Sequence, residues 1–128
     1  MGGSEDILAA ARAIRPYLPE LLAEHAAARA DARLAELLER GDEAGIVDEF
    51  EGDENVRDWA AGFLEHGMPP DIAAREERSF QLAPGYGDAV RIPEFACPRG
   101  DYTWYRHAVG QTPPKCPTHQ LVVEPVDR

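Results

Sequence analysis

The chain has 128 residues, which is enough for one domain with a real core, or for a helical domain of about 65 residues with a smaller appendage. Its formal net charge of −11 argues against nucleic acid as a partner, because phosphate repels an acidic surface. No apolar run is long enough to span a bilayer, and the first residues lack the basic and apolar regions of a secretory signal. We therefore expect a cytoplasmic protein with no membrane partner.

Composition divides the chain into three parts. Residues 1–66 are rich in Leu and Ala and hold sixteen acidic residues against six arginines. Residues 67–93 are rich in Pro and Gly, and we predict a linker that packs on the helices through Phe80, Leu82 and Tyr86. Residues 94–128 are about neutral, with four acidic and four basic residues. Arginine supplies twelve of the thirteen basic residues of the chain, as in high-GC bacteria.

Four amphipathic helices are predicted in the first part, so a bundle is the economical arrangement. They run from Ser4 to the residue before Pro16, from Pro19 to about Arg40, from Asp42 to about Phe50, and from Asp53 to about His66. On the second helix, His25, Ala28 and Ala32 fall on the apolar side, so we predict that His25 is a partly buried core residue.

The third part contains two similar tight turns, each beginning with a Cys-Pro dipeptide. Their sequences are Cys97-Pro-Arg-Gly100 and Cys116-Pro-Thr-His119. Residues 101–109 alternate as a strand would, and residues 121–123 form a second predicted strand. In a cytoplasmic protein a cysteine pair favours metal binding over a disulfide, and zinc prefers a turn that presents two ligands three residues apart. Cys116 and His119 meet that spacing, whereas Gly100 cannot be a ligand.

The two turns resemble the paired Cys-Pro-x-Cys-Gly knuckles of zinc-ribbon and rubredoxin-like domains. The resemblance covers about the last 35 residues and implies a zinc-ribbon-like β-hairpin with a structural zinc ion held by Cys97, Cys116 and His119. Asp101 or His107, water or a partner protein would complete the shell. Asp101 adjoins the first turn, whereas an extended strand would carry His107 roughly 20 Å away from it.

Other interpretations of these residues remain open. Both cysteines can be small buried hydrophobes, or they can form a disulfide. A three-ligand zinc with an open position would be typical of a metal-dependent enzyme, although no accompanying general base is evident. The aromatic residues can stack on single-stranded nucleic acid, form a small core, or dock the hairpin on the helices.

We predict an α+β protein: a four-helix, bundle-like domain followed by a zinc-ribbon-like hairpin. The expected function is that of a non-enzymatic adaptor or accessory protein of a bacterial multi-component system. Its acidic helices would bind a protein partner with a basic surface, and the hairpin would add a second contact through Tyr102, Trp104 and Arg106. The alternatives are a metal-dependent enzyme with an open zinc shell and a ribbon-type nucleic-acid-binding module.

Overall fold

A computed structural model describes residues 3–74, 93–106 and 110–126 of the chain. We call residues 3–74 the helical part and the remaining described residues the sheet part. The helical part comprises α1 (Gly3–Ile14), the 3₁₀ turn η1 (Arg15–Tyr17), α2 (Leu18–Leu21), α3 (Glu24–Arg40), α4 (Glu43–Glu51) and α5 (Glu54–His66). The sheet part comprises β1 (Glu94–Ala96), β2 (Thr103–Tyr105) and β3 (Glu124–Pro125). The predicted α+β class is confirmed.

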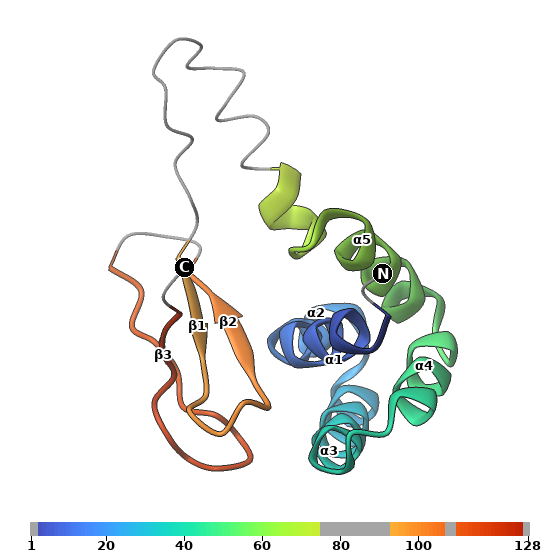
Figure 1. Cartoon of the computed structure of the whole chain (residues 1–128), viewed down its shortest axis with the longest axis horizontal. Coiled ribbons are helices and arrows are strands. Elements are labelled where there is room, and N and C mark those ends of the chain that lie inside the picture. The colour runs from blue at the N-terminus through green and yellow to red at the C-terminus, as the bar shows by residue number, and fades with distance from the viewer. Residues whose placement is uncertain (1–2, 75–92, 107–109, 127–128) are drawn as a thin grey trace, which may run out of the picture.

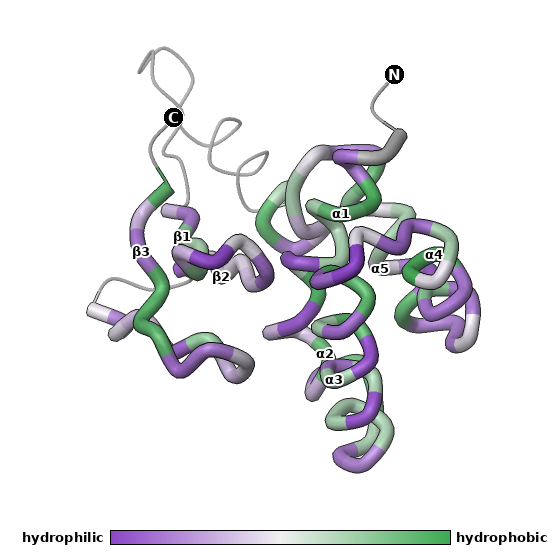
Figure 2. The backbone as a smooth tube through the Cα atoms, turned by 60° about the horizontal axis from the view of Figure 1, so that its bottom comes forward, coloured by the Kyte–Doolittle hydropathy of each residue, from purple (hydrophilic) through white to green (hydrophobic). Residues whose placement is uncertain are grey.

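Helix α1 lies at the centre of the molecule. Figures 1 and 2 both place it between the sheet on one side and α4 and α5 on the other. Four residues in its second half, Ala10, Ala11, Ala13 and Ile14, are at 0% exposure. The small alanine side chains allow close approach on more than one side, so α1 can contact neighbours on both sides.

The prediction of one continuous second helix, from Pro19 to Arg40, is wrong, because the segment forms two helices. Leu22 has an extended backbone (φ −132°, ψ 159°) and separates α2 from α3. No helix-breaking residue stands at this point. Instead, the carbonyl oxygen of Leu21 accepts a hydrogen bond from Asn55 Nδ2 at 3.3 Å, so a distant segment stabilises the break.

The break changes which face of α3 is buried. The buried residues are Ala27, Ala30, Leu34 and Leu37, at the i, i+3, i+7 and i+10 positions. His25 is exposed, so the prediction of a partly buried histidine is wrong. A helix that continued without a break through Leu22 would place His25 on its apolar side, whereas in α3, which begins anew at Glu24, His25 faces solvent.

The last two helices begin next to Asp42 and Asp53, the residues from which the sequence predicts them to run. Asp42 Oδ1 accepts a hydrogen bond from the Gly45 amide at 3.0 Å at the start of α4. Asp53 Oδ1 accepts from the amides of Asn55 at 2.8 Å and Val56 at 3.1 Å at the start of α5. These carboxylates satisfy amides that have no partner within the helix and also favour its positive end.

The sheet has three antiparallel strands in the order β2-β1-β3. Phe95 of the central strand β1 lies opposite Trp104 of β2 and opposite Pro125 of β3. The sequence predicts strands over residues 101–109 and 121–123. Within the first range only β2 (Thr103–Tyr105) forms a strand among the described residues. Within the second, Val122 makes an isolated bridge to Lys115. The short segment Glu94–Ala96 was not recognised as a strand, because three residues carry too little alternation to identify one.

No helix in residues 3–74, 93–106 or 110–126 is long and apolar enough to cross a membrane. Residues 70–74 form a helical turn after α5, and Ile72 within it is buried. Most of the predicted linker, with Phe80, Leu82 and Tyr86, lies outside the described residues, as does His107. The three-part division of the chain stays a prediction.

Candidate metal centre

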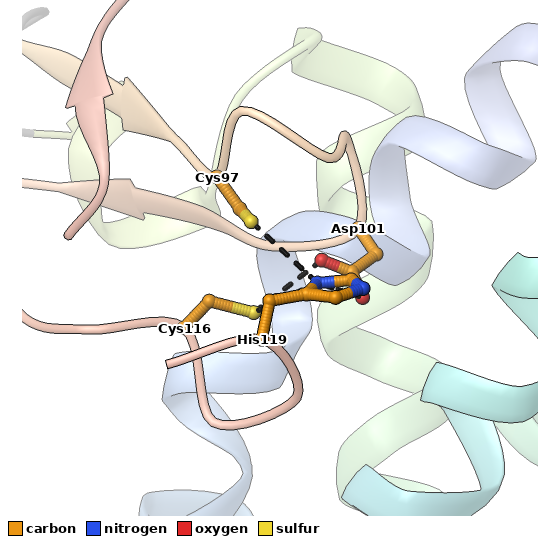
Figure 3. A group of neighbouring side chains, drawn as sticks. All are labelled: Cys97, Asp101, Cys116 and His119. Carbon is orange, nitrogen blue, oxygen red and sulfur yellow. Dashed lines mark hydrogen bonds and ion pairs between the residues drawn. The ribbon is translucent and has the colours of Figure 1, made fainter. Parts of the chain in front are cut away.

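The two Cys-Pro turns are built on the same hydrogen-bond frame. The amide of Cys97 donates to the carbonyl oxygen of Tyr102 at 2.8 Å, and the amide of Cys116 donates to that of Leu121, also at 2.8 Å. Each cysteine therefore closes a loop onto the residue five positions later. The two loops lie beside each other, and their cysteines point toward a common centre (Figure 3).

Four potential metal ligands meet at this centre. One ligand atom each from Cys97, Asp101, Cys116 and His119 lies within 4.8 Å of all the others. His119 Nδ1 is 3.7 Å from Cys97 Sγ, 3.8 Å from Cys116 Sγ and 3.3 Å from Asp101 Oδ2. Cys116 Sγ lies 3.4 Å from Asp101 Oδ1. Both cysteines are buried, and His119 is the most accessible of the four.

The four separations that link His119 to the other ligands and Cys116 to Asp101 are close to the edges of a tetrahedron around a zinc ion. Zinc binds thiolate sulfur at about 2.3 Å and imidazole nitrogen or carboxylate oxygen at about 2.0–2.2 Å. A regular tetrahedron with those bond lengths has edges of about 3.3 to 3.8 Å. The cluster can therefore accept a four-coordinate metal ion after its ligand atoms, which lie within 4.8 Å of one another, draw together. Two sulfur atoms, one nitrogen and one oxygen are a donor set that suits zinc.

The Cys97 thiol lies in an unfavourable environment for its charged form. Burial raises the pKa of Cys97 above its ordinary value, and nearby Cys116 and Asp101 add to the rise. The amide of Arg99, which donates to Cys97 Sγ at 3.4 Å, opposes it. Three potentially anionic side chains gathered in one buried place are compatible with a bound cation, which would stabilise the thiolates.

Asp101 lies with the three predicted ligands and can therefore serve as the fourth, which the sequence left undecided. Gly100, three residues after Cys97, adopts a left-handed backbone (φ +82°) that a residue with a side chain rarely adopts. The first loop thus offers its second ligand from the following residue, Asp101, whereas the second loop offers His119 from the third position after Cys116. His107 lies outside the described residues, and the four candidate ligands among the described residues are Cys97, Asp101, Cys116 and His119.

Sequence reasoning missed Arg15, which connects the cluster to the helices. Arg15 is 3% exposed. Its Nη1 donates to the carbonyl oxygen of Asp101 at 2.7 Å, and its Nη2 donates to Thr118 Oγ1 at 2.7 Å. Its Nε and Nη2 also hold both carboxylate oxygens of Asp31 on α3, at 2.7 and 3.2 Å. One side chain therefore joins both loops to the helical part.

A weak signal for Arg15 exists in the sequence. The residue follows Ile14 directly and precedes Pro16, where the apolar side of the first helix ends. A charged residue at this point is more often solvent-exposed than buried, so the position alone does not predict the contact.

Burial by itself would lower the pKa of Arg15, but the hydrogen bond and charge of Asp31, together with Asp101, raise it overall.

The three residues predicted to bind a partner make contacts within the protein. Tyr102 is 8% exposed and lies with its ring 5.3 Å from the guanidinium carbon of Arg15. Trp104 packs against Phe95 with ring centroids 5.3 Å apart, and the guanidinium of Arg106 lies 5.0 Å from the same phenyl ring. For Tyr102 these contacts agree with docking of the sheet part on the helices. Partner binding by Trp104 and Arg106 stays a prediction.

A polar cavity of about 380 Å³ borders the cluster. It lies between α3 and the two loops, and its walls include the candidate ligands Asp101 and His119. Glu39 and Arg99 also line it. The centre is therefore accessible to small polar molecules from this side, while Cys116 on the opposite side is fully buried.

Comparison with other proteins adds no family to this description. No protein-family model, no curated protein and no solved structure matches the chain. The resemblance to zinc ribbons therefore has no support from a homologue. What the structure supports is a cluster of two cysteines, an aspartate and a histidine that can hold a metal ion.

Proposed function

We propose that the protein is a non-enzymatic interaction protein whose sheet part is held together by a structural zinc ion. The supporting observation is the convergence of Cys97, Asp101, Cys116 and His119, whose ligand atoms lie within 4.8 Å of one another. Four protein ligands would close the coordination shell, and a closed shell is typical of structural rather than catalytic zinc. In this proposal the zinc-ribbon-like character of the segment rests on its two loops and their ligands.

The small size of the sheet part explains why it would need a metal. Its strands are two or three residues long, and its own buried cluster consists of Phe95, Cys97, Tyr102, Cys116 and Val123. A core of this size contributes too little burial to offset the conformational entropy of the chain. A metal ion that joins the two loops would supply the missing stabilisation.

The helical part offers a surface for a protein partner. An apolar groove of about 810 Å³ lies beside α3, and its walls include Leu18, Leu22, Ala26, Ala30 and Val56. Three acidic residues, Glu36, Glu49 and Asp53, and two arginines, Arg29 and Arg33, also line it, and residues 1–66 carry most of the negative charge of the chain. This combination fits an amphipathic helix with a basic polar face, whose apolar side would occupy the groove. Its cations would meet the acidic surface.

Elemental analysis tests the metal. Protein purified without added metal should contain about one equivalent of zinc, and the variants Cys97→Ser, Cys116→Ser and His119→Asn should lose it. His25→Asn on α3 is the matched control, because His25 is exposed and distant in sequence from the loops. The proposal would be contradicted if the purified wild-type protein contained no metal and also failed to bind zinc that was added to it.

A second experiment tests the interaction surface. Affinity capture with the wild-type chain should retain a protein that Leu22→Arg loses, because a charged side chain at this position disrupts the apolar wall against which the partner's helix would pack. Leu64→Arg is the control, since Leu64 is 42% exposed on α5 and does not line the groove. Identical captured proteins for Leu22→Arg and the wild type would remove the groove as the binding site.

A metal-dependent enzyme is the second candidate, and the cavity beside Asp101 and His119 favours it. If the Asp101 carboxylate gave its position to water, zinc would become a three-ligand site able to activate that water. Cobalt substitution separates the two functions. A visible spectrum that is independent of pH indicates a closed structural shell, whereas a spectrum that titrates with a bound water indicates an open one.

A further inference from the structure

The buried guanidinium of Arg15 holds both ligand-bearing loops at once. It donates to the main chain of Asp101, a candidate ligand, and to the side chain of Thr118, the residue before the candidate ligand His119. Bidentate contact with Asp31 fixes the orientation of the guanidinium on the helical side. The two remaining loop contacts can therefore form together only when the loops have a particular separation.

The charge of Arg15 also complements the proposed metal centre. Two thiolates and one carboxylate around a divalent ion leave a formal charge of about −1. Arg15 Nη1 lies 3.6 Å from Asp101 Oδ2, and the side chain of Arg15 is 1% exposed. At this depth the positive charge is little screened by solvent, so it stabilises the anionic centre more than a surface arginine would.

We infer that Arg15 is a positioning residue of the metal centre, and that through it metal binding and docking of the sheet part on the helices are coupled. The inference rests on the proposed metal site. Metal binding sets the distance between the loops, and that distance aligns the acceptors of Asp101 and Thr118 with the guanidinium. Conversely, a docked Arg15 brings the ligands together before the metal arrives. By thermodynamic linkage the two effects are equal in size.

Metal affinity is the first measurement. Competition of zinc between a chelator and the full chain should show that Arg15→Met lowers the affinity by about 10- to 100-fold, as is typical for residues that orient metal ligands. Arg15→Lys should recover part of the loss, because it keeps the charge but not the forked geometry. Arg57→Met on the exposed surface of α5 is the control and should bind zinc as the wild type does.

Amide hydrogen exchange provides a measurement that a merely structural role would not change. In the wild type, adding zinc to the metal-free chain should slow exchange in η1 and α3 as well as in the loops. In Arg15→Met, zinc should protect the loops while its effect on η1 and α3 falls by the same factor as the affinity. Wild-type zinc affinity together with wild-type protection of the helices in Arg15→Met would overturn the inference.

Thr118→Val keeps the test valid if Arg15→Met does not fold. Thr118 is exposed and is not a candidate ligand, so its replacement removes only one acceptor from the guanidinium. We expect zinc affinity to fall about tenfold or more, as for loss of one hydrogen bond to a charged group. Thr112→Val, an exposed position outside both loops, should have no effect. Equal affinities for the two threonine variants would also overturn the inference.

The two proposals fail in different ways. If the wild-type chain binds no metal, the proposed function fails and this inference with it. If the wild type binds zinc but its affinity is indifferent to Arg15 and Thr118, the metal site stands and only the coupling is wrong.

Discussion

Trp104 and Tyr105 are neighbours in β2, yet they belong to different hydrophobic cores. Tyr105 is 4% exposed and packs with the core of the helical part. Trp104 packs on the cluster of the sheet part, against Phe95. Because successive side chains of a strand point to opposite faces, one three-residue strand lies between both cores. The sheet part is therefore attached to the helices by packing as well as by Arg15.

Replacing Tyr105 should destabilise the whole molecule more than replacing Trp104. Tyr105→Ala removes a buried ring from the main core, and we expect a loss of about 3–5 kcal/mol in the free energy of unfolding. Trp104 is only half-buried, so Trp104→Ala should cost about 1–2 kcal/mol. Urea unfolding followed by the helical circular dichroism signal measures both values. A larger loss for Trp104→Ala would contradict this assignment of the two rings.

Gly62 on α5 should not tolerate a side chain. A Cβ atom at this position would lie 2.6 Å from Pro70 Cγ, and the rigid proline ring cannot move aside alone. Although alanine favours a helix by about 1 kcal/mol, we expect Gly62→Ala to lower stability by about 1–3 kcal/mol through overpacking. Gly52→Ala is the control. Its nearest contact would be an ordinary 3.5 Å, so that variant should be neutral or slightly stabilised in thermal unfolding.

Removal of the metal should affect the sheet part before the helical part. The helical core includes Ile14, Leu18, Leu34 and Leu37, each at most 1% exposed, and needs no metal to remain buried. After treatment with a strong chelator we expect amide protection in β1 and β2 to be lost, while the helical circular dichroism signal changes little. Cys116→Ser should resemble the chelated protein without treatment. Unchanged protection in the strands after complete metal removal would show that the sheet part does not depend on the ion.

The protein should lose stability at high pH because buried tyrosines resist ionisation. Burial raises the pKa of Tyr102 to about 12, with a further contribution from the charge of Asp31. Burial and the charge of Asp71 also raise the pKa of Tyr17, which donates to Asp71 Oδ2 at 3.3 Å. An unfolded tyrosine ionises near pH ~10. The stability that the protonated rings contribute is therefore complete below about pH 10 and is lost as the pH rises toward 12.

Circular dichroism and tyrosinate absorbance, recorded together, test this pH dependence. We expect unfolding and tyrosine ionisation to occur in the same transition, and Tyr17→Phe to move that transition to higher pH. A native circular dichroism signal that persists after all tyrosines have ionised near their ordinary pKa would contradict the burial effect.

Local patterns in the sequence are sufficient for the starts of α4 and α5 and for two of the candidate ligands. Asp42 and Asp53 begin α4 and α5 because their carboxylates satisfy amides only two or three residues away. Cys116 and His119 are similarly close in sequence, and one tight turn presents both. Interactions of this range depend on the residues nearby, so spacing alone predicts them.

The remaining features depend on contacts between distant segments. The break after Leu21 involves Asn55, and the face of α3 that is buried depends on that break. Asp101 completes the cluster because Gly100 takes the turn position and because the second loop folds against the first. Arg15 meets Asp101 across 86 positions.

The sequence by itself determined where α4 and α5 begin and which two short turns carry the cysteines, because those features follow from local hydrogen bonding and spacing. Only the tertiary structure decided that Asp101 joins the cluster and that a buried arginine links it to η1 and α3. The physical reason is that burial makes a charged group depend on its partners. Those partners are brought together by packing of the whole chain.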